Sequence, residues 1–247
     1  MGKLTLVAAT CLALLLMIDL PRRFRGSAPQ QAPPDLGATV LENALRGPGL
    51  VSPSRCRREG TFAAFQDGSL LMRVAGKCSE TQLYPAVAAT VDGLTVPDGE
   101  VSVEIKVADD ARAGAFAISM RRPGRRAEAP DGIYGGIDFA RGNALIVRWV
   151  MGESTVLAER NDLTGLRRDD WNRLAVRADW PRLWLILNDE PILSATDGMF
   201  DGGHVALHTL RFTQPDDSAE VAVLVRNLRV SDLAAALPER APVYRRS

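Results

Sequence analysis

The chain lacks a net charge. In its 247 residues, 30 lysines and arginines balance 30 aspartates and glutamates. A balanced chain has no global field that would draw it towards DNA, RNA or an anionic membrane surface. We therefore expect no nucleic-acid partner, and any charged ligand must be recognised by a local cluster of side chains.

Cysteine is scarce, with three in the chain. Cys11 lies in an N-terminal apolar run whose sequence matches a lipoprotein box only loosely, which leaves Cys56 and Cys78 for the mature chain. In an oxidising compartment such a pair is most simply a disulfide, worth about 3 kcal/mol in the chain-entropy model. In the cytosol the alternative is two unrelated thiols. No third ligand at metal spacing accompanies them, so no zinc site is expected.

One long apolar run begins the sequence, from Leu4 to Leu20, and it is broken only by Asp19. With Lys3 before it, the run has the pattern of an export signal. It is marginal in length as a membrane anchor, and no good small-x-small cleavage site follows. Residues 1–25 are predicted to be either a signal peptide or a membrane anchor, with an atypical N-terminus as the alternative. We expect an exported protein (periplasmic, cell-envelope or secreted), which contacts the membrane through residues 4–20 if they act as an anchor.

The composition then predicts a linker, a folded domain and a tail. Residues 26–38 are rich in Pro, Gln and Ala, which suits an extended tether. Residues 39–235 are predicted to form the domain, and residues 236–247 a C-terminal tail. Within the domain, Thr39 to Leu45 is expected to form a turn or two of helix before Gly47 stops it.

No long helical pattern follows, and the periodicity changes to two. It is clearest at Val101–Val107, where apolar and polar residues alternate, so that one face is core and the other is wet. Runs with similar alternation occur at Ser69–Ala75, Ala86–Val96, Gly114–Met120, Gly132–Phe139, Ala144–Met151, Thr155–Glu159, Asn172–Ala178, Arg182–Asn188, His204–Thr209 and Ala219–Val230. A further short strand is expected between Asp189 and His204. Ten or so short strands separated by turn signals favour an all-β, two-sheet antiparallel jelly-roll sandwich.

The order of several segments carries a family resemblance. They are Ala113–Met120, Tyr134–Phe139, Leu145–Leu157, Trp171–Leu174, Leu183–Asn188, Thr196–Phe200, Gly203–Leu207 and Val225–Val230. In this order the chain resembles the concanavalin A-like lectin/glucanase superfamily, near the laminin G-like and 3-keto-disaccharide hydrolase-like bacterial domains. The resemblance covers about half of the chain and implies a fold, since the superfamily spans lectins, glycosidases and modules of no known activity.

The chain departs from that pattern at two places. Val225, Arg226 and Asn227 stand where such domains usually close with a Phe-Asp-Asn type strand, and Asp189 stands where a Gly commonly follows Asn188. The departures put in doubt any ligand or calcium chemistry of the relatives. The Glu-x-Asp-x-x-Glu string of the glucanase branch is absent, which speaks against a classical retaining glucanase.

Aromatic residues make up only 6% of the chain, and one tryptophan among them is a candidate ligand contact because it is expected off the core face. The leucines of Arg182–Asn188 share one face, which places Trp184 on the other. A ring there suits a sugar, and Tyr134 and Trp149 could join it as a stacking platform. The alternative is that the N-terminal segment or a loop covers Trp184.

The two histidines, His204 and His208, are four positions apart and are expected on one face of a strand, with Val205 and Leu207 pointing inwards. They could bind a ligand or move a proton. Because no further ligand lies at a usual metal spacing, no metal is predicted there, and a solvated or hydrogen-bonded pair is the alternative.

Hydrolysis of a glycoside requires two carboxylates that flank the scissile bond. The weak candidates are Glu104 and Asp138, with His208 assisting. Asp197 to Asp201, and acidic residues in other turns (Asp109, Asp110, Asp189, Asp216 and Asp217), offer oxygen ligands for calcium, although such turns are usually only solvated.

A basic hairpin tip is the remaining candidate. Guanidinium forks suit sulfate, phosphate or carboxylate groups, and the alternative is a solvated loop. The four arginines are Arg121, Arg122, Arg125 and Arg126.

The sequence thus favours an exported or membrane-tethered, non-catalytic module that binds a carbohydrate or glycoconjugate. The alternatives are a glycoside hydrolase of the 3-keto-disaccharide hydrolase-like kind and an envelope module that binds another protein.

Overall fold

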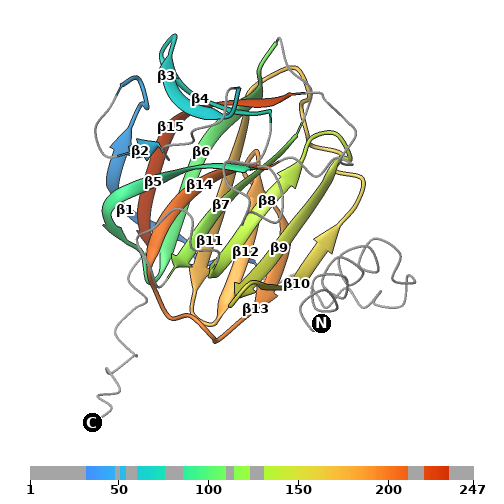
Figure 1. The fold of residues 1–247 in the computed structure, drawn as a ribbon. Helices are drawn as coiled ribbons and strands as arrows, with labels where there is room; N and C mark the ends of the chain where they lie inside the picture. Colours follow the sequence, from blue (N-terminus) through green and yellow to red (C-terminus); the bar gives the residue numbers. More distant parts are fainter. Residues whose placement is uncertain are drawn as a thin grey trace, which may run out of the picture. The chain divides into compact units, whose positions relative to one another are not determined.

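The computed structural model describes residues 32–47, 51–53, 60–75, 86–109, 114–122, 131–210 and 220–233. All of them belong to one unit, Gln31–Ser247. Fifteen β-strands and no α-helix lie in these ranges, so the described fold is all-β (Figure 1). No described segment is a helix of the length and apolarity that a membrane crossing requires.

Two antiparallel sheets form the fold. Sheet A has eight strands, in the order β13-β12-β11-β6-β15-β4-β3, and β1 also pairs with β15. Its strands are β1 (Leu36–Asn43), β3 (Phe62–Gln66), β4 (Ser69–Val74), β6 (Gly99–Val107), β11 (Asn172–Asp179), β12 (Arg182–Leu187), β13 (Glu190–Thr196) and β15 (Val221–Leu233).

Sheet B has seven strands, in the order β10-β9-β8-β7-β14-β5-β2. They are β2 (Val51–Pro53), β5 (Ala86–Thr95), β7 (Ala115–Arg122), β8 (Gly132–Asp138), β9 (Asn143–Val150), β10 (Glu153–Arg160) and β14 (His204–Leu210). In both sheets strands far apart in sequence are neighbours, such as β15 between β6 and β4. The predicted two-sheet antiparallel sandwich is therefore confirmed.

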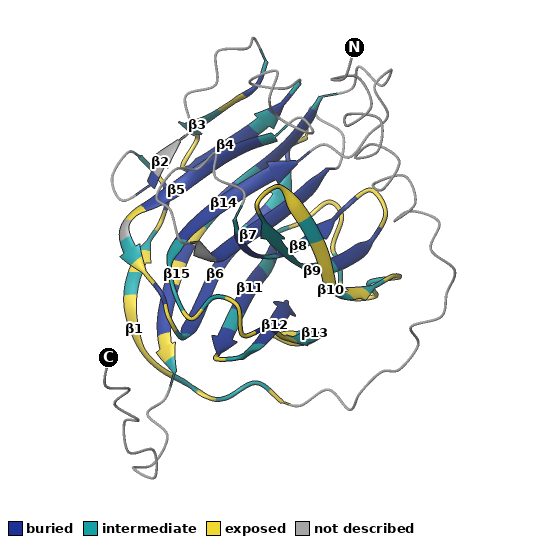
Figure 2. Cartoon of the chain, turned by 60° about the horizontal axis from the view of Figure 1, so that its bottom comes forward, coloured by how far each residue is buried: buried dark blue, intermediate teal, exposed yellow. Residues whose placement is uncertain are grey.

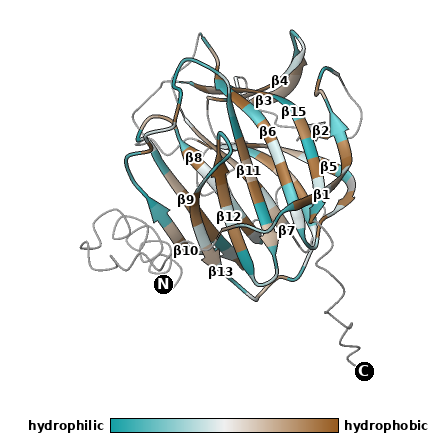
Figure 3. Ribbon diagram, turned by 180° about the vertical axis from the view of Figure 1, so that it is seen from behind, coloured by the Kyte–Doolittle hydropathy of each residue, from teal (hydrophilic) through white to brown (hydrophobic). Residues whose placement is uncertain are grey.

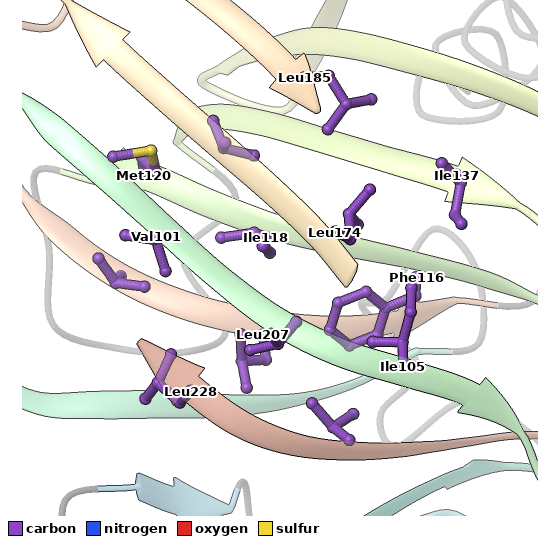
Figure 4. Close-up of a cluster of buried hydrophobic side chains, with 14 of the residues drawn as sticks. Val101, Ile105, Phe116, Ile118, Met120, Ile137, Leu174, Leu185, Leu207 and Leu228 are labelled. Atoms are coloured by element: carbon purple, nitrogen blue, oxygen red, sulfur yellow. The ribbon is translucent and has the colours of Figure 1, made fainter. Parts of the chain in front are cut away.

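The hydrophobic core lies between the sheets. Strand β6 contributes Val101 and Ile105, and β7 contributes Phe116 and Ile118, all fully buried. Figure 4 shows these side chains meeting with Leu174, Leu185 and Leu207 from other strands. In Figure 2 the inner strands of both sheets are mostly dark blue, whereas β1 and β10 carry exposed segments. Burial of an apolar side chain contributes about 1.5–3 kcal/mol, so this layer supplies the main driving force for the sandwich.

Gly135 allows β8 and β11 to pack closely. It lies on the inward side of β8, and a Cβ there would be 2.6 Å from Val176 Cγ2 and 3.1 Å from Leu185 Cδ1. A side chain at this position would force the two sheets apart. The packing distance between the sheets is thus set in part by a missing side chain.

Most strands predicted from alternation are found within a few residues of their expected ends, including the short one, β13. The expected helix at Thr39 to Leu45 is wrong, because these residues form most of β1. Leu41 pairs there with Val230, and the hydrogen bonds of β15 are satisfied by this strand. The strand begins at Leu36, inside the segment that its composition assigned to a linker.

A bulge in β15 positions side chains on the outward face of sheet A. The register with β6 shifts between Arg226 and Arg229, and Asn227 has a positive φ of 54°. Arg226 and Asn227 both turn outward, and Leu228 returns to the core. Bulges commonly re-aim side chains in this way, often beside functional sites.

Candidate ligand-binding groove

A groove of about 940 Å³ lies on the outward face of sheet A. It is lined by the β3–β4 hairpin, by β15 and by residues at the ends of β6 and β11. The lining residues are Arg46, Phe62, Gln66, Asp67, Gly68, Ser69, Leu71, Arg73, Ala108, Asp109, Trp171, Leu224, Arg226 and Asn227. Ligand sites usually have volumes of about 300–1,000 Å³, so this groove is large enough for a ligand of several rings.

The floor of the groove is apolar and its sides carry two aromatic rings. Leu71 and Ala108 belong to a small cluster, apart from the main core, against which Leu224 packs. Phe62 is 37% exposed and Trp171 is half-buried. Apolar surface flanked by aromatic rings suits a ligand with both apolar and polar faces.

Alternation in the closing strands explains why these residues face outward. In β15, Val223 and Val225 enter the core, which leaves Leu224 and Arg226 on the other side. Figure 3 shows bands of hydrophilic and hydrophobic residues along β6 and β15. The tight turn of the β3–β4 hairpin uses Asp67 and Gly68, with φ of 49° and 75°, the Asp-Gly combination that such turns favour.

Arg226 is held in place from two sides. Its Cζ lies over the Trp171 ring, 3.8 Å from the centroid, and its Nε donates a hydrogen bond of 2.7 Å to Glu104 Oε2. Arg226 and Glu104 are also direct cross-strand partners in β15 and β6. Opposite charges in such a pair stabilise a sheet by a few tenths of a kcal/mol to about 1 kcal/mol.

The environment of Glu104 favours its charged form. Partial burial acts to raise the pKa of this carboxyl, but hydrogen bonds from Arg226 and Asn227 and the charges of Arg226 and Arg173 outweigh that effect. The pKa is therefore held below its usual value of 4.5. Glu104 is a carboxylate at neutral pH.

A smaller cavity of about 380 Å³ shares two residues, Ala108 and Asp109, with the groove. Its other lining residues include Lys106, Phe139 and Arg168. Lys106 Nζ and Asp109 Oδ1 form an ion pair of 2.9 Å at the boundary between the two cavities. The two cavities therefore adjoin one another just past the end of β6.

A second cluster of polar and aromatic side chains lies on the outward face of sheet B. The His208 and Tyr134 ring centroids are 5.1 Å apart, and His208 Nε2 is 2.8 Å from Ser119 Oγ. Ser119 Oγ is also within hydrogen-bonding distance of the Ala206 carbonyl oxygen, at 3.2 Å, and can donate to it. The structure thus brings together His208 and Tyr134, two of the predicted ligand residues. Trp149 is on the same face of sheet B, in β9, which neighbours the strand of Tyr134, β8.

Solved structures show where this architecture belongs. A carbohydrate binding module, CBM66, from Bacillus subtilis matches with a TM-score of 0.55 and 17% identity over 72% of this chain and 93% of that chain. A protein of unknown function with a galectin-like fold, also from B. subtilis, gives 0.57 and 15% over 81% and 98%. LamA from Z. galactanivorans, in complex with laminaritriose and laminaritetraose, gives 0.55 and 9% over 80% and 100%.

The fold is that of the concanavalin A-like lectins and glucanases. A β-glucanase from Bacillus licheniformis matches it with a TM-score of 0.55 and 9% identity, over 80% of this chain and 99% of that chain. No protein-family model and no curated protein sequence matches the chain. The predicted resemblance is confirmed at the level of fold, and carbohydrate-binding modules and glucanases both have this fold.

Trp184 does not offer a stacking surface in this concanavalin A-like sandwich. It lies off the main core, as alternation predicts, but it is only 1% exposed. Arg182 Cζ is 5.5 Å from its ring centroid, and its cross-strand neighbours on β11 and β13 are Arg177 and Ser194. The long stem of an arginine covers apolar surface well, which is why an outward tryptophan can be buried here.

The two candidate carboxylates, Glu104 and Asp138, do not lie together. Glu104 is on the outward face of sheet A, whereas Asp138 ends β8 in sheet B, and the core of the concanavalin A-like fold separates the two faces. Asp138 is 6% exposed and accepts hydrogen bonds from the backbone of Ala140 and Arg141, at 2.9 and 3.2 Å. Asp138 therefore stabilises a turn, and His208 lies on its sheet rather than beside Glu104.

His204 and His208 share β14, and Val205 and Leu207 between them are buried as expected. They do not form one site, because the register of β14 with both neighbouring strands is irregular between His204 and Ala206. His204 Nδ1 instead lies 3.3 Å from the Leu94 carbonyl oxygen.

Two aspartates of the acidic turns pair with basic side chains. Asp197 pairs with Arg148 at 2.8 Å, and Asp189 pairs with Arg173 at 2.8 Å. Within the described residues, no group of three or more His, Cys, Asp or Glu side chains could hold a metal ion. Asp110, Asp216 and Asp217 lie outside these residues.

Several further candidates also lie outside the described part of the chain. They are Cys56 and Cys78, Arg125 and Arg126, the side chains of Arg121 and Arg122, residues 4–20 and the tail at 236–247.

The groove itself was not predicted as a site. Trp171 was noted only in a segment that carries the family resemblance, and Arg226 was also noted as a departure from the usual closing strand. The signal that could have found Arg226 is its alternation with Val223 and Val225, which places a long charged side chain outside the core beside a bulge.

Proposed function

We propose that this protein is a non-catalytic carbohydrate-binding module, and that its ligand lies in the groove of sheet A. The observation that carries the proposal is the groove of about 940 Å³ in which Trp171 and Phe62 stand beside hydrogen-bonding groups. The concanavalin A-like fold supports it, because structures with this fold include a carbohydrate binding module and an enzyme in complex with laminari-oligosaccharides.

The groove has the mixed chemistry that a sugar requires. A pyranose ring has apolar C–H faces, which pack on aromatic or aliphatic surface, and a rim of hydroxyls that need partners. Leu71, Leu224 and the two aromatic rings supply apolar surface for the C–H faces. Gln66 and Asn227 supply amide groups for the hydroxyls. A concave surface with a few polar groups is the usual form of a small-ligand site, whereas a flat sheet would favour a protein partner.

Binding rather than hydrolysis suits the carboxylates around the groove. Glu104 is hydrogen-bonded to Arg226 and has a lowered pKa, so it does not carry the proton that a general acid needs at neutral pH. Asp109, on the groove wall, is paired with Lys106. Glu104 and Asp109 are thus each paired with a basic side chain, and Asp67, the other aspartate of the lining, accepts a hydrogen bond of 3.1 Å from Gln66 Nε2.

We also propose that the module acts outside the cytoplasm. Its support is the apolar run from Leu4 to Leu20 after Lys3, which has the pattern of an export signal. Glycans that an exported or tethered module could bind are found at cell surfaces and in the surrounding medium.

The proposal is tested by applying the full-length protein to a broad glycan array, with two variants alongside it. Trp171→Ala removes an aromatic wall of the groove, and Trp180→Ala is the matched control, because Trp180 is 49% exposed and does not line the groove. We expect selective glycan binding that Trp171→Ala weakens by about ten-fold or more and Trp180→Ala retains. Folded protein that binds no glycan, or equal binding by all three proteins, would reject the assignment.

A further inference from the structure

We infer that the groove selects saccharides that carry carboxylate groups, as uronic acids do, and that Arg226 is the residue that recognises the carboxylate. The inference rests on the proposed carbohydrate-binding function and adds a ligand class to it.

The guanidinium of Arg226 is fixed before any ligand arrives. Stacking over Trp171 sets its plane, and the hydrogen bond from Nε to Glu104 sets its rotation within that plane. Alternation along β15 places the side chain on the side of the groove, and Glu104 in turn is held by Arg226 and Asn227. Little side-chain entropy remains to be lost on binding, and such pre-organisation raises affinity.

The fixed guanidinium leaves one edge available. A guanidinium has five N–H donors, and Glu104 takes the one on Nε. Within the described residues, Nη1 and Nη2 of Arg226 have no hydrogen-bond partner, and the residue lines the groove. Two parallel N–H groups on one edge match the two oxygens of a carboxylate, and this bidentate pairing is stronger than a hydrogen bond between neutral groups.

The groove as a whole does not act as an anion trap. Its lining carries three arginines and two aspartates, and among these Arg73 is paired with Glu220 at 2.7 Å and Asp109 with Lys106. Without a large positive field, a highly charged ligand gains little from charge alone. Selectivity must come from the geometry of one fork, which favours a planar carboxylate in register with a sugar ring that packs on the aromatic walls.

The test compares oligosaccharides that differ only in the carboxylate. Oligomers of galacturonate, glucuronate and mannuronate are each paired with their carboxyl-reduced counterparts, and a sulfated neutral oligosaccharide is added as a second anion. Affinities are measured by titration calorimetry on the full-length protein. We expect at least one uronate oligomer to bind about ten-fold or more tightly than its reduced counterpart, since a charge-assisted bidentate pair is lost on reduction.

Variants then assign the preference to one side chain. Arg226→Lys keeps the positive charge but loses the fork, so we expect it to lose the uronate preference while its binding of reduced oligomers changes little. Arg229→Lys is the matched control, because Arg229 is in the same strand and exposed, and it bonds to Thr39 rather than lining the groove.

The outcomes separate the inference from the proposed function. Equal affinity of the wild-type protein for acidic and reduced oligomers, a preference for the sulfated one, or a preference that survives Arg226→Lys would overturn the inference while carbohydrate binding stands. The wild-type comparison does not depend on the folding of any variant. Absence of binding to every oligomer here and to every glycan on the array would overturn both.

Discussion

The two outward faces of the sandwich are built from the same alternation but carry different chemistry. On sheet A, long charged side chains are paired across strands, as in Glu104 with Arg226, beside the apolar residues that form the floor of the groove. On sheet B, around β7 and β14, they are small, as in Ala115 and Ala117, and they surround the buried His208. Alternation decides which residues leave the core, whereas their size and charge decide whether the face is closed by packing or holds a groove.

The outward face of sheet A also contains a buried carboxylate, Glu100. Its replacement is expected to have the largest effect on stability. The Glu100 side chain is 2% exposed, and its two oxygens accept hydrogen bonds from Arg173 and from Nε and Nη2 of Arg177. Glu100→Gln leaves Arg177 without a carboxylate and Arg173 with Asp189 alone, in a partly buried site. We expect the free energy of unfolding to fall by about 3 kcal/mol, measured by denaturant titration at neutral pH.

The control for this change is Glu153→Gln. Glu153 is an exposed residue at the start of β10 and forms no ion pair within the described residues. Its replacement is expected to change stability by less than about 0.5 kcal/mol. If Glu100→Gln cost no more than that, the cross-strand charges would not hold sheet A together.

The face of small residues is tested by Ser119→Ala, which removes the hydroxyl between His208 and the Ala206 carbonyl. Both members of the Ser119–His208 pair are buried, so we expect a loss of about 1 kcal/mol in the free energy of unfolding. Glycan binding in the groove should not change, because Ser119 is on the other sheet. Ser154→Ala, on the edge strand β10, serves as the control for stability. Loss of glycan binding in Ser119→Ala would indicate that the ligand binds on sheet B rather than in the groove of sheet A.

The fold could be predicted from the sequence because strand alternation is local. Val101 and Ile105 show it within a few residues of each other, and most strands and turns follow from such runs. The helix expected at Thr39 to Leu45 failed because pairing with β15, on a distant part of the chain, decided that segment. Local preference is a weak guide where a long-range ladder competes for the same backbone.

The site could not be predicted, because its residues come together only through pairing between distant strands. Glu104 and Arg226 are 122 positions apart and meet only because β6 and β15 are neighbours in sheet A. The sequence placed Trp184 correctly off the main core, yet its burial depends on neighbours from other strands that no local pattern reveals. Trp171, by contrast, was not predicted as a ligand contact, yet it forms a wall of the groove.

The smallest expected effect concerns the Glu104–Arg226 pair on the charged face and how its contribution to stability depends on pH. Glu104→Gln removes one partly exposed ion pair, so its cost at neutral pH should be below about 1 kcal/mol. Because the folded state lowers the pKa of Glu104, the carboxylate stabilises the fold fully only above its usual value of 4.5. This contribution is lost as the pH falls through the lower pKa of the folded state. The difference in unfolding free energy between wild type and Glu104→Gln should therefore be constant near neutral pH and shrink below about pH 4.5. A difference that grew on acidification would mean that Arg226 and Asn227 do not favour the charged form, and the fixed guanidinium on which the carboxylate preference depends would lose its anchor.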